Sequence, residues 1–262
     1  MALLTLRFLN IVQPGVGWKG LGMGFTYFIS DVHLGMRKGE SETEREDRLL
    51  KFFDHVGIYG DRLIIVGDLF DFWFEYRTVI PRGYMRTLSA LNQLRELGKE
   101  LHYVAGNHDF WMRDFLPREL GIQIHFDAFK YTIAGKHFYI HHGDGIAKWD
   151  KGYRLLKRIF RNRINIFLYS LLHPDLGIPL AKWVSHLSRQ HTFRGDVPDD
   201  TDYRQEAMRR FEEGYDYVVF GHLHYPTLQE YGEKVYVNLG DWIRHFSYGV
   251  FNDVELMLRT WE

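Results

Sequence analysis

Aspartate, asparagine and histidine residues gather at the ends of five short apolar segments of this chain. Carboxylate and carboxamide oxygens mixed with imidazole nitrogens suit Mn²⁺, Fe²⁺ or Zn²⁺ better than Ca²⁺ or Cu⁺. Seven such side chains exceed what one tetrahedral ion needs, so the sequence predicts two metals that share a carboxylate. Metals paired in this way can clamp a phosphoryl group and generate hydroxide at neutral pH. The candidate ligands are Asp31, His33, Asp68, Asn107, His142, His222 and His224.

The elements that must position these residues alternate along the chain. Strand-like segments with β-branched or aromatic content directly precede the clusters, at 25–30, 62–66, 100–105, 137–140 and 215–220. Helical patterns lie between them, at 44–56, 84–97 and 202–213. This alternation predicts an α/β fold with its site beyond the carboxyl ends of the strands. Later strands near 234–239 and 248–258 follow one another without a helix, so we expect part of the sheet to be antiparallel.

Composition bounds the remaining possibilities. The 262 residues include 16% aromatics and only 7 prolines, which excludes a disordered chain. A net charge of −1 argues against a protein that binds nucleic acid over its whole surface. There are no cysteines, which excludes thiolate metal sites and is compatible with a reducing compartment. We expect residues 1–24 to form an extension outside the core and residues 25–262 to form one domain.

Residues 148–191 interrupt the alternation and are expected to form a helical lid inserted over the site. Between 148 and 163 there are seven basic residues and one acid, Asp150. Apolar residues run through this segment at near-helical spacing, which is typical of a basic amphipathic helix. Such a helix can lie on an anionic membrane surface or line a tunnel for acyl chains. The alternative is a helix that packs on the core and exposes a solvated basic face.

The order of the motifs D-x-H, G-D-x-x-D, G-N-H-D, H-G-D and G-H-x-H resembles that of the calcineurin-like metallophosphoesterases, from Asp31 to His224. The resemblance implies a four-layer sandwich of two mixed sheets flanked by helices. It also implies that Asp31, His33, Asp68 and His224 hold the first metal. Asp68 would bridge to a second metal, which Asn107, His142 and His222 would also hold, and a hydroxide would attack phosphorus in line.

Further roles follow from the same resemblance. His108, beside Asn107, would stabilise or protonate the leaving oxygen. The family's ligand precedes the glycine of H-G-D, so His142 is preferred to His141. Nearby carboxylates could orient the imidazoles, with turn stabilisation as the alternative role. These carboxylates are Asp71, Asp109 and Asp144.

Within that superfamily the chain more closely resembles the UDP-2,3-diacylglucosamine diphosphatases of lipid A biosynthesis, through residues 67–73, 142–144 and the insertion that follows. This implies a lipid-linked UDP-sugar substrate, two Mn²⁺ ions (with Fe²⁺ or Zn²⁺ as alternatives), and a cytoplasmic enzyme peripheral to the inner membrane of a Gram-negative cell. The enterobacterial branch has Asn-Arg where this chain has Asn107-His108, which puts substrate identity in doubt. Substrate contacts are expected from Asn107, His108 and, by loose alignment, from Asp150, Ser188 and Arg189.

Two other functions remain open at this point. The same metal chemistry could act on another phosphodiester, a nucleotide or a phosphoprotein. Alternatively, the chain could be a scaffold that kept the fold without catalysis, although such a chain would be expected to lose ligands and all seven are present. The sequence leaves the oligomeric state open.

Overall fold

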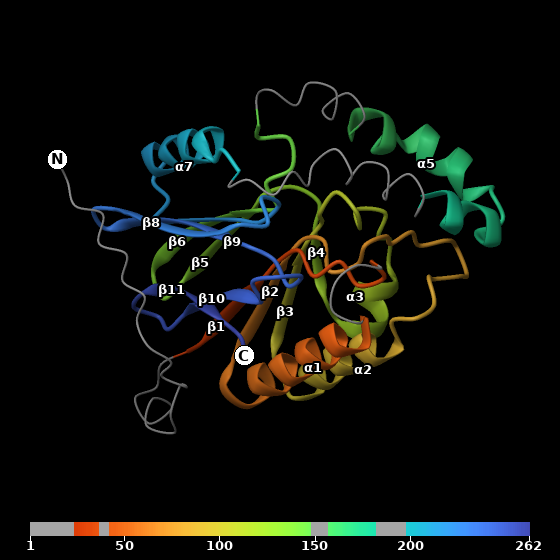
Figure 1. Cartoon of the computed structure of the whole chain (residues 1–262), viewed down its shortest axis with the longest axis horizontal. Helices are drawn as coiled ribbons and strands as arrows, with labels where there is room; N and C mark the ends of the chain where they lie inside the picture. The colour runs from red at the N-terminus through yellow and green to blue at the C-terminus, as the bar shows by residue number, and fades with distance from the viewer. Residues whose placement is uncertain (1–23, 37–41, 148–156, 182–197) are drawn as a thin grey trace.

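The computed structural model describes residues 24–36, 42–147, 157–181 and 198–262. These residues form two mixed β-sheets that pack face to face (Figure 1). The six-stranded sheet has the order β11-β10-β1-β2-β3-β4, and the five-stranded sheet has the order β5-β6-β7-β9-β8. The strands are β1 (Thr26–Ile29), β2 (Arg62–Val66), β3 (Glu100–Val104), β4 (Gln123–His125), β5 (Phe129–Ile133), β6 (Lys136–His141), β7 (Tyr217–Phe220), β8 (Pro226–Tyr231), β9 (Lys234–Leu239), β10 (Ser247–Phe251) and β11 (Leu256–Thr260).

Helices cover the outer face of each sheet. On the six-stranded sheet these are α1 (Glu42–Tyr59), α2 (Met85–Glu96) and α3 (Phe115–Leu120), and on the five-stranded sheet α7 (Thr201–Glu212). Helix α5 (Arg163–Ser170) lies at the edge of the molecule, apart from these layers (Figure 1). The expected four-layer sandwich of mixed sheets is therefore confirmed.

Alternation along the central strands explains the layers. In β1, Tyr27 and Ile29 join the core beneath α1 and α2, whereas Phe28 points to the core between the sheets. In β7, Val219 faces the same inner core, whereas Phe220 packs beneath α7. Side chains on successive strand residues point to opposite faces, so strands covered on both faces must be apolar throughout.

The parallel strands place the polar clusters at common edges. Strands β1, β2 and β3 are parallel neighbours, and so are β6, β7 and β9. Five of these six strands, all but β9, end in loops that carry candidate site residues, and the carboxyl ends of neighbouring parallel strands meet at one edge. Two packed sheets thus direct loops from distant parts of the sequence toward one site.

The C-terminal region differs from the sequence-based expectation. The segment expected near 248–258 is two strands, β10 and β11, which pair antiparallel with each other. Asn252 makes the turn between them by accepting hydrogen bonds from the backbone N–H groups of Val254 and Glu255. The antiparallel pairing expected here is present, between β10 and β1 and between β8 and β9. The patterning did not predict β4, β5, β8 or α3.

One further expectation concerns the N-terminal end of the chain. The expected extension, residues 1–24, lies outside the described residues except for Gly24. Among the described helices, none is both long and apolar enough to cross a membrane.

Candidate metal centre

The first group of candidate ligands comes from the loops after β1 and β7. His224 Nε2 lies 3.2 Å from Asp31 Oδ1, and His33 Nε2 lies 3.6 Å from the same oxygen. The ligand atoms of these three residues all lie within 4.8 Å of one another, a spacing at which they could surround one ion. The other oxygen of Asp31 accepts a hydrogen bond from the His222 backbone N–H at 2.8 Å, which fixes the carboxylate.

The second group comes from the loops after β2, β3, β6 and β7. His142 Nε2 lies 3.0 Å from Asn107 Oδ1 and 3.3 Å from Asp68 Oδ2. The ring centroid of His222 is 5.1 Å from that of His142. All four side chains that were expected around a second metal therefore lie together.

Asp68 lies between the two groups. Its Oδ2 is 3.3 Å from His142 Nε2 and 3.7 Å from His33 Nε2. Its Oδ1 accepts the backbone N–H of His108 at 2.9 Å, so the carboxylate is held with the other oxygen toward both groups. This is the geometry that a bridging carboxylate requires.

Five of the seven candidate ligands have a left-handed backbone. Their φ angles lie between 50° and 71°, a region that non-glycine residues enter at an energetic cost. Such strain persists where the surrounding structure fixes it, and it is concentrated at functional sites. The strained ligands are Asp31, His33, Asp68, His222 and His224.

Glycines let the ligand loops approach one another closely. A Cβ on Gly106 would lie 2.0 Å from Asp68 Oδ1, closer than any real contact allows. Gly67 has a φ of 83°, and a Cβ there would lie 2.4 Å from His142 Nδ1. The glycines before Asp68 and Asn107 are therefore required by the packing of the second ligand group.

The ring nitrogens that face away from the two groups are also held. His142 Nδ1 contacts the carbonyl of Val66 at 2.9 Å, and His33 Nδ1 lies 3.5 Å from Asp71 Oδ1. Such contacts fix the orientation of an imidazole and direct its other nitrogen to the metal side. The expectation that Asp71 orients an imidazole agrees with this geometry.

Sequence reasoning missed a further residue of this kind, Asp241. Its buried carboxylate lies 3.6 Å from His224 Nδ1, and Oδ1 accepts the backbone N–H groups of three following residues. The signal was available, because Gly240-Asp241 follows the predicted strand at 234–239 just as Gly67-Asp68 follows an earlier strand.

Comparison with known proteins agrees with this site. The family model described as calcineurin-like phosphoesterase matches residues 26–226, most of the chain. The chain belongs to the calcineurin-like phosphoesterase family. Members of this family use divalent metals to hydrolyse phosphoesters, which accounts for the two groups of ligands.

The curated relatives of this chain have names more specific than that of the family. A protein of Porphyromonas gingivalis named UDP-2,3-diacylglucosamine hydrolase is 35% identical over 90% of this chain and 97% of its own length. A protein of Nitrosococcus oceani with the same name is 28% identical over 84% of this chain and 88% of its own. An archaeal phosphodiesterase of known structure has a TM-score of 0.45 and 13% identity, covering 90% of this chain and 98% of its own.

The donor set of this phosphoesterase fits divalent metals. Among the described residues, Asp31 Oδ1 and His33 Nε2 are buried and have no hydrogen-bond partner. Burial disfavours charged imidazoles, yet nearby carboxylates raise the pKa of His33 and of His142 to about 10. Against the effect of burial, nearby imidazoles hold the pKa of both carboxyl groups well below the usual range, His224 foremost for Asp31 and His142 for Asp68. Protons on histidines thus balance buried carboxylates, and a bound cation would replace those protons.

Two predicted orienting carboxylates have other contacts. Asp109 was expected either to orient an imidazole or to stabilise a turn, and its carboxylate accepts the backbone N–H groups of Gly106, Asp68 and Phe70 and the hydroxyl of Tyr103. It therefore ties the loops after β2 and β3 together, because their close approach leaves buried N–H groups that need an acceptor. The ion pairs of Asp144 are formed with Lys157 and Arg161.

The remaining predicted residues lie at or beyond the margin of the site. His108 Nδ1 contacts the carbonyl of Asp71 at 3.0 Å, and the side chain groups with His33 and Asp68. His141 accepts the backbone N–H of Gly143. The predicted substrate contacts Asp150, Ser188 and Arg189 fall outside the described residues.

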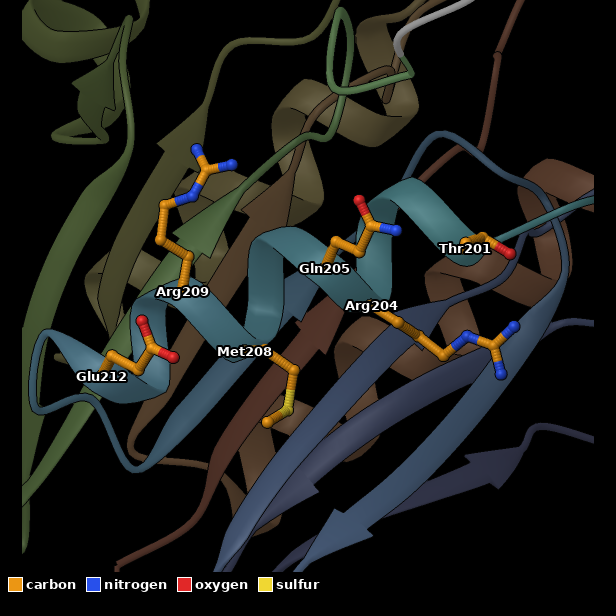
Figure 2. A pocket seen from close by; sticks show the side chains of 6 residues that line it. All are labelled: Thr201, Arg204, Gln205, Met208, Arg209 and Glu212. Atoms are coloured by element: carbon orange, nitrogen blue, oxygen red, sulfur yellow. The ribbon is translucent and has the colours of Figure 1, made fainter.

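A shallow hollow on the outer face of α7 is separate from the predicted site (Figure 2). It contains none of the predicted site residues. All its lining residues come from α7, on the side opposite the residues that pack against the sheet, so we assign it no role in the chemistry. The lining residues are Thr201, Arg204, Gln205, Met208, Arg209 and Glu212.

Proposed function

We propose that this phosphoesterase hydrolyses the diphosphate of UDP-2,3-diacylglucosamine to UMP and 2,3-diacylglucosamine 1-phosphate. The observation that carries the proposal is the likeness to the P. gingivalis hydrolase, which extends over 90% of this chain. In the reaction, water adds to one phosphorus while the bond from that phosphorus to the bridging oxygen breaks. The two phosphate products take up the elements of water.

We propose two metal positions for this reaction, most simply filled by Mn²⁺, with Fe²⁺ or Zn²⁺ as alternatives. Bound metals would neutralise phosphate charge and lower the pKa of water. Asp68 would belong to both positions, because its Oδ2 faces both groups. The first metal would be held by Asp31, His33, Asp68 and His224, and the second by Asp68, Asn107, His142 and His222.

His108 is proposed to protonate the leaving oxygen. The contact between Nδ1 and the Asp71 carbonyl places a proton on that nitrogen and directs Nε2 away from it. The ring lies edge-on to His33, with centroids 4.8 Å apart, so it borders the first ligand group. When the ring carries a second proton on Nε2, it can donate that proton to an oxygen that leaves phosphorus.

The lid, which we define as residues 157–181, is proposed to contact the lipid part of the substrate and an anionic membrane surface. One side of it packs through Ile166 and Tyr169 on Phe74 and its neighbours. Its other side carries eight of the sixteen large apolar side chains that are exposed in the described parts of the chain. We call this set the lid face: Ile159, Ile164, Phe167, Leu168, Leu171, Leu172, Leu176 and Leu180.

An exposed apolar surface of this kind marks a site of interaction with lipid or protein. Acyl chains and a bilayer both offer the apolar contact that these side chains lack in water. We propose attachment at the cytoplasmic face of the inner membrane, where the substrate's acyl chains reside.

A product assay tests the proposed substrate. Purified protein with Mn²⁺ is given UDP-2,3-diacylglucosamine or, in parallel, UDP-N-acetylglucosamine, and UMP release is measured. We expect UMP from the acylated compound alone. Hydrolysis of a generic phosphodiester without either UDP-sugar would exclude the proposed substrate while leaving the phosphoesterase assignment intact.

A further inference from the structure

The first described turn of the lid forms ion pairs with a buried carboxylate beside the metal centre. Lys157 Nζ lies 2.6 Å from Asp144 Oδ2 and donates to the Asp144 carbonyl at 3.0 Å. Arg161 Nη2 lies 3.5 Å from the same carboxylate oxygen. The Asp144 side chain is 1% exposed and follows His142 by two residues, so both cations contact the loop that carries a ligand of the second group.

The same turn also contacts the loop that carries Asn107. The Arg161 guanidinium donates to the carbonyls of Gly106 and Phe126 and lies over the ring of Phe110, 5.2 Å from its centroid. One residue earlier, the carbonyl of Phe160 accepts the indole N–H of Trp111 at 3.1 Å. Arg161 therefore contacts both the loop after β3 and the loop after β6. These loops belong to different sheets, so strand pairing does not connect them.

These contacts distinguish two kinds of cation in the lid. Lys157 and Arg161 are only 22% and 26% exposed, and both are directed at Asp144. Arg158, between them, is exposed. A wholly solvated basic face, which the sequence left open, would not bury two of its cations against a carboxylate.

We infer that Lys157 and Arg161 are positioning residues, a latch that fixes the lid against the loops carrying Asn107 and His142. This inference deepens the proposed function and rests on it for the role of the lid in binding substrate. A planar guanidinium spreads its N–H donors over a rigid fork and can reach a carboxylate and two carbonyls that lie apart, whereas the three donors of an ammonium group all lie on one nitrogen. The Asp144 carboxylate is buried, and losing either cation removes part of the positive charge that compensates it, so the latch should weaken when either cation is lost.

The experiment compares Arg161→Met, Arg161→Lys and Lys157→Met in the full-length, metal-loaded protein. KM and kcat are measured for UDP-2,3-diacylglucosamine, and kcat for the small soluble ester bis(p-nitrophenyl) phosphate. Hydrogen exchange of residues 157–181 is measured without substrate. Arg209→Met is the matched control, because Arg209 is an exposed arginine that pairs with a carboxylate on α7.

We expect Arg161→Met to raise KM for the acylated substrate about tenfold or more, since small misplacements of binding elements have effects of this size. Exchange in the lid should become faster, and kcat for the small ester should stay within about twofold. Arg161→Lys should fall between the native protein and Arg161→Met. The control should change none of these quantities.

Two results would overturn the latch. One is unchanged exchange and unchanged KM in both methionine variants. The other is an equal loss of kcat for both substrates, which would place the cations in the chemistry itself. If the acylated compound is not a substrate at all, the proposed function fails, but lid exchange still tests the latch independently.

Discussion

The ligand loops and the lid are neighbouring regions that differ in which side chains they bury and which they expose. In the ligand loops, polar side chains are buried and their second atoms are fixed by backbone groups, as in Asp68 and His142. In the lid, large apolar side chains are exposed, and the contacts to the rest of the molecule include one aromatic cluster and the ion pairs and hydrogen bonds of Lys157 and Arg161. Under the proposed function, the core would fix the reaction and the lid would determine which substrate reaches it.

The largest expected effect concerns the carboxylate between the two ligand groups. Asp68→Ala should lower kcat/KM by at least about a thousandfold, because both metal positions lose a ligand and bound metals supply several kcal/mol of transition-state stabilisation. Metal content per chain, measured by inductively coupled plasma mass spectrometry, should fall together with activity.

Asp47→Ala is the control for this substitution. Asp47 is an exposed carboxylate on α1 that pairs with Arg86, so activity and metal content should not change. Full activity of Asp68→Ala with two metals bound would contradict the two-metal arrangement.

A smaller loss of activity is expected from Asp241→Asn. This substitution tests how much the residues that orient the candidate ligands contribute, compared with the ligands themselves. Asp241→Asn keeps an oxygen for the three backbone N–H groups but removes the negative charge beside His224. Loss of such an orienting carboxylate typically costs 10- to 100-fold in metal affinity or activity. Metal titration together with kcat measures it, and an unchanged metal affinity would show that His224 needs no such support.

Sequence reasoning located the ligand loops because their signal is local. A strand pattern followed by Gly-Asp or Gly-Asn-His places a metal-binding side chain at a sheet edge, and the glycines reflect close approaches such as that of Gly106 to Asp68. The predicted boundaries of these elements also lie close to the observed ones. The strand predicted at 62–66 coincides with β2, and the helix predicted over 84–97 is α2, Met85–Glu96.

What the sequence could not give depends on contacts between distant segments. Asp109 serves backbone amides rather than an imidazole because two loops from different strands meet at its side chain. Lys157 and Arg161 are part of a basic run that predicts a solvated or membrane-facing surface. Their inward direction follows from Asp144, and periodicity within the lid contains no information about that partner.

The smallest expected effect on stability comes from substitutions in the lid face. These substitutions test whether the exposed side chains serve lipid contact or folding. Phe167→Ser combined with Leu171→Ser removes two side chains that are 61% and 67% exposed. Exposed substitutions of this kind change stability by about 0.5 kcal/mol or less, so the midpoint of unfolding and hydrolysis of a small ester should be nearly unchanged. Ile166→Ser, on the packed side of the same helix, is the matched control and should destabilise the protein more.

Binding to vesicles of phosphatidylethanolamine and phosphatidylglycerol should be weakened more by the double variant than by Ile166→Ser. Burying a Phe or Leu side chain contributes about 1.5–3 kcal/mol, so the double variant should lose at least tenfold in vesicle affinity by sedimentation. If the double variant binds vesicles as the native protein does, the lid face is not the membrane contact. If it instead unfolds as readily as Ile166→Ser, the exposed residues support the fold, and the contrast between core and lid is weaker than the contacts indicate.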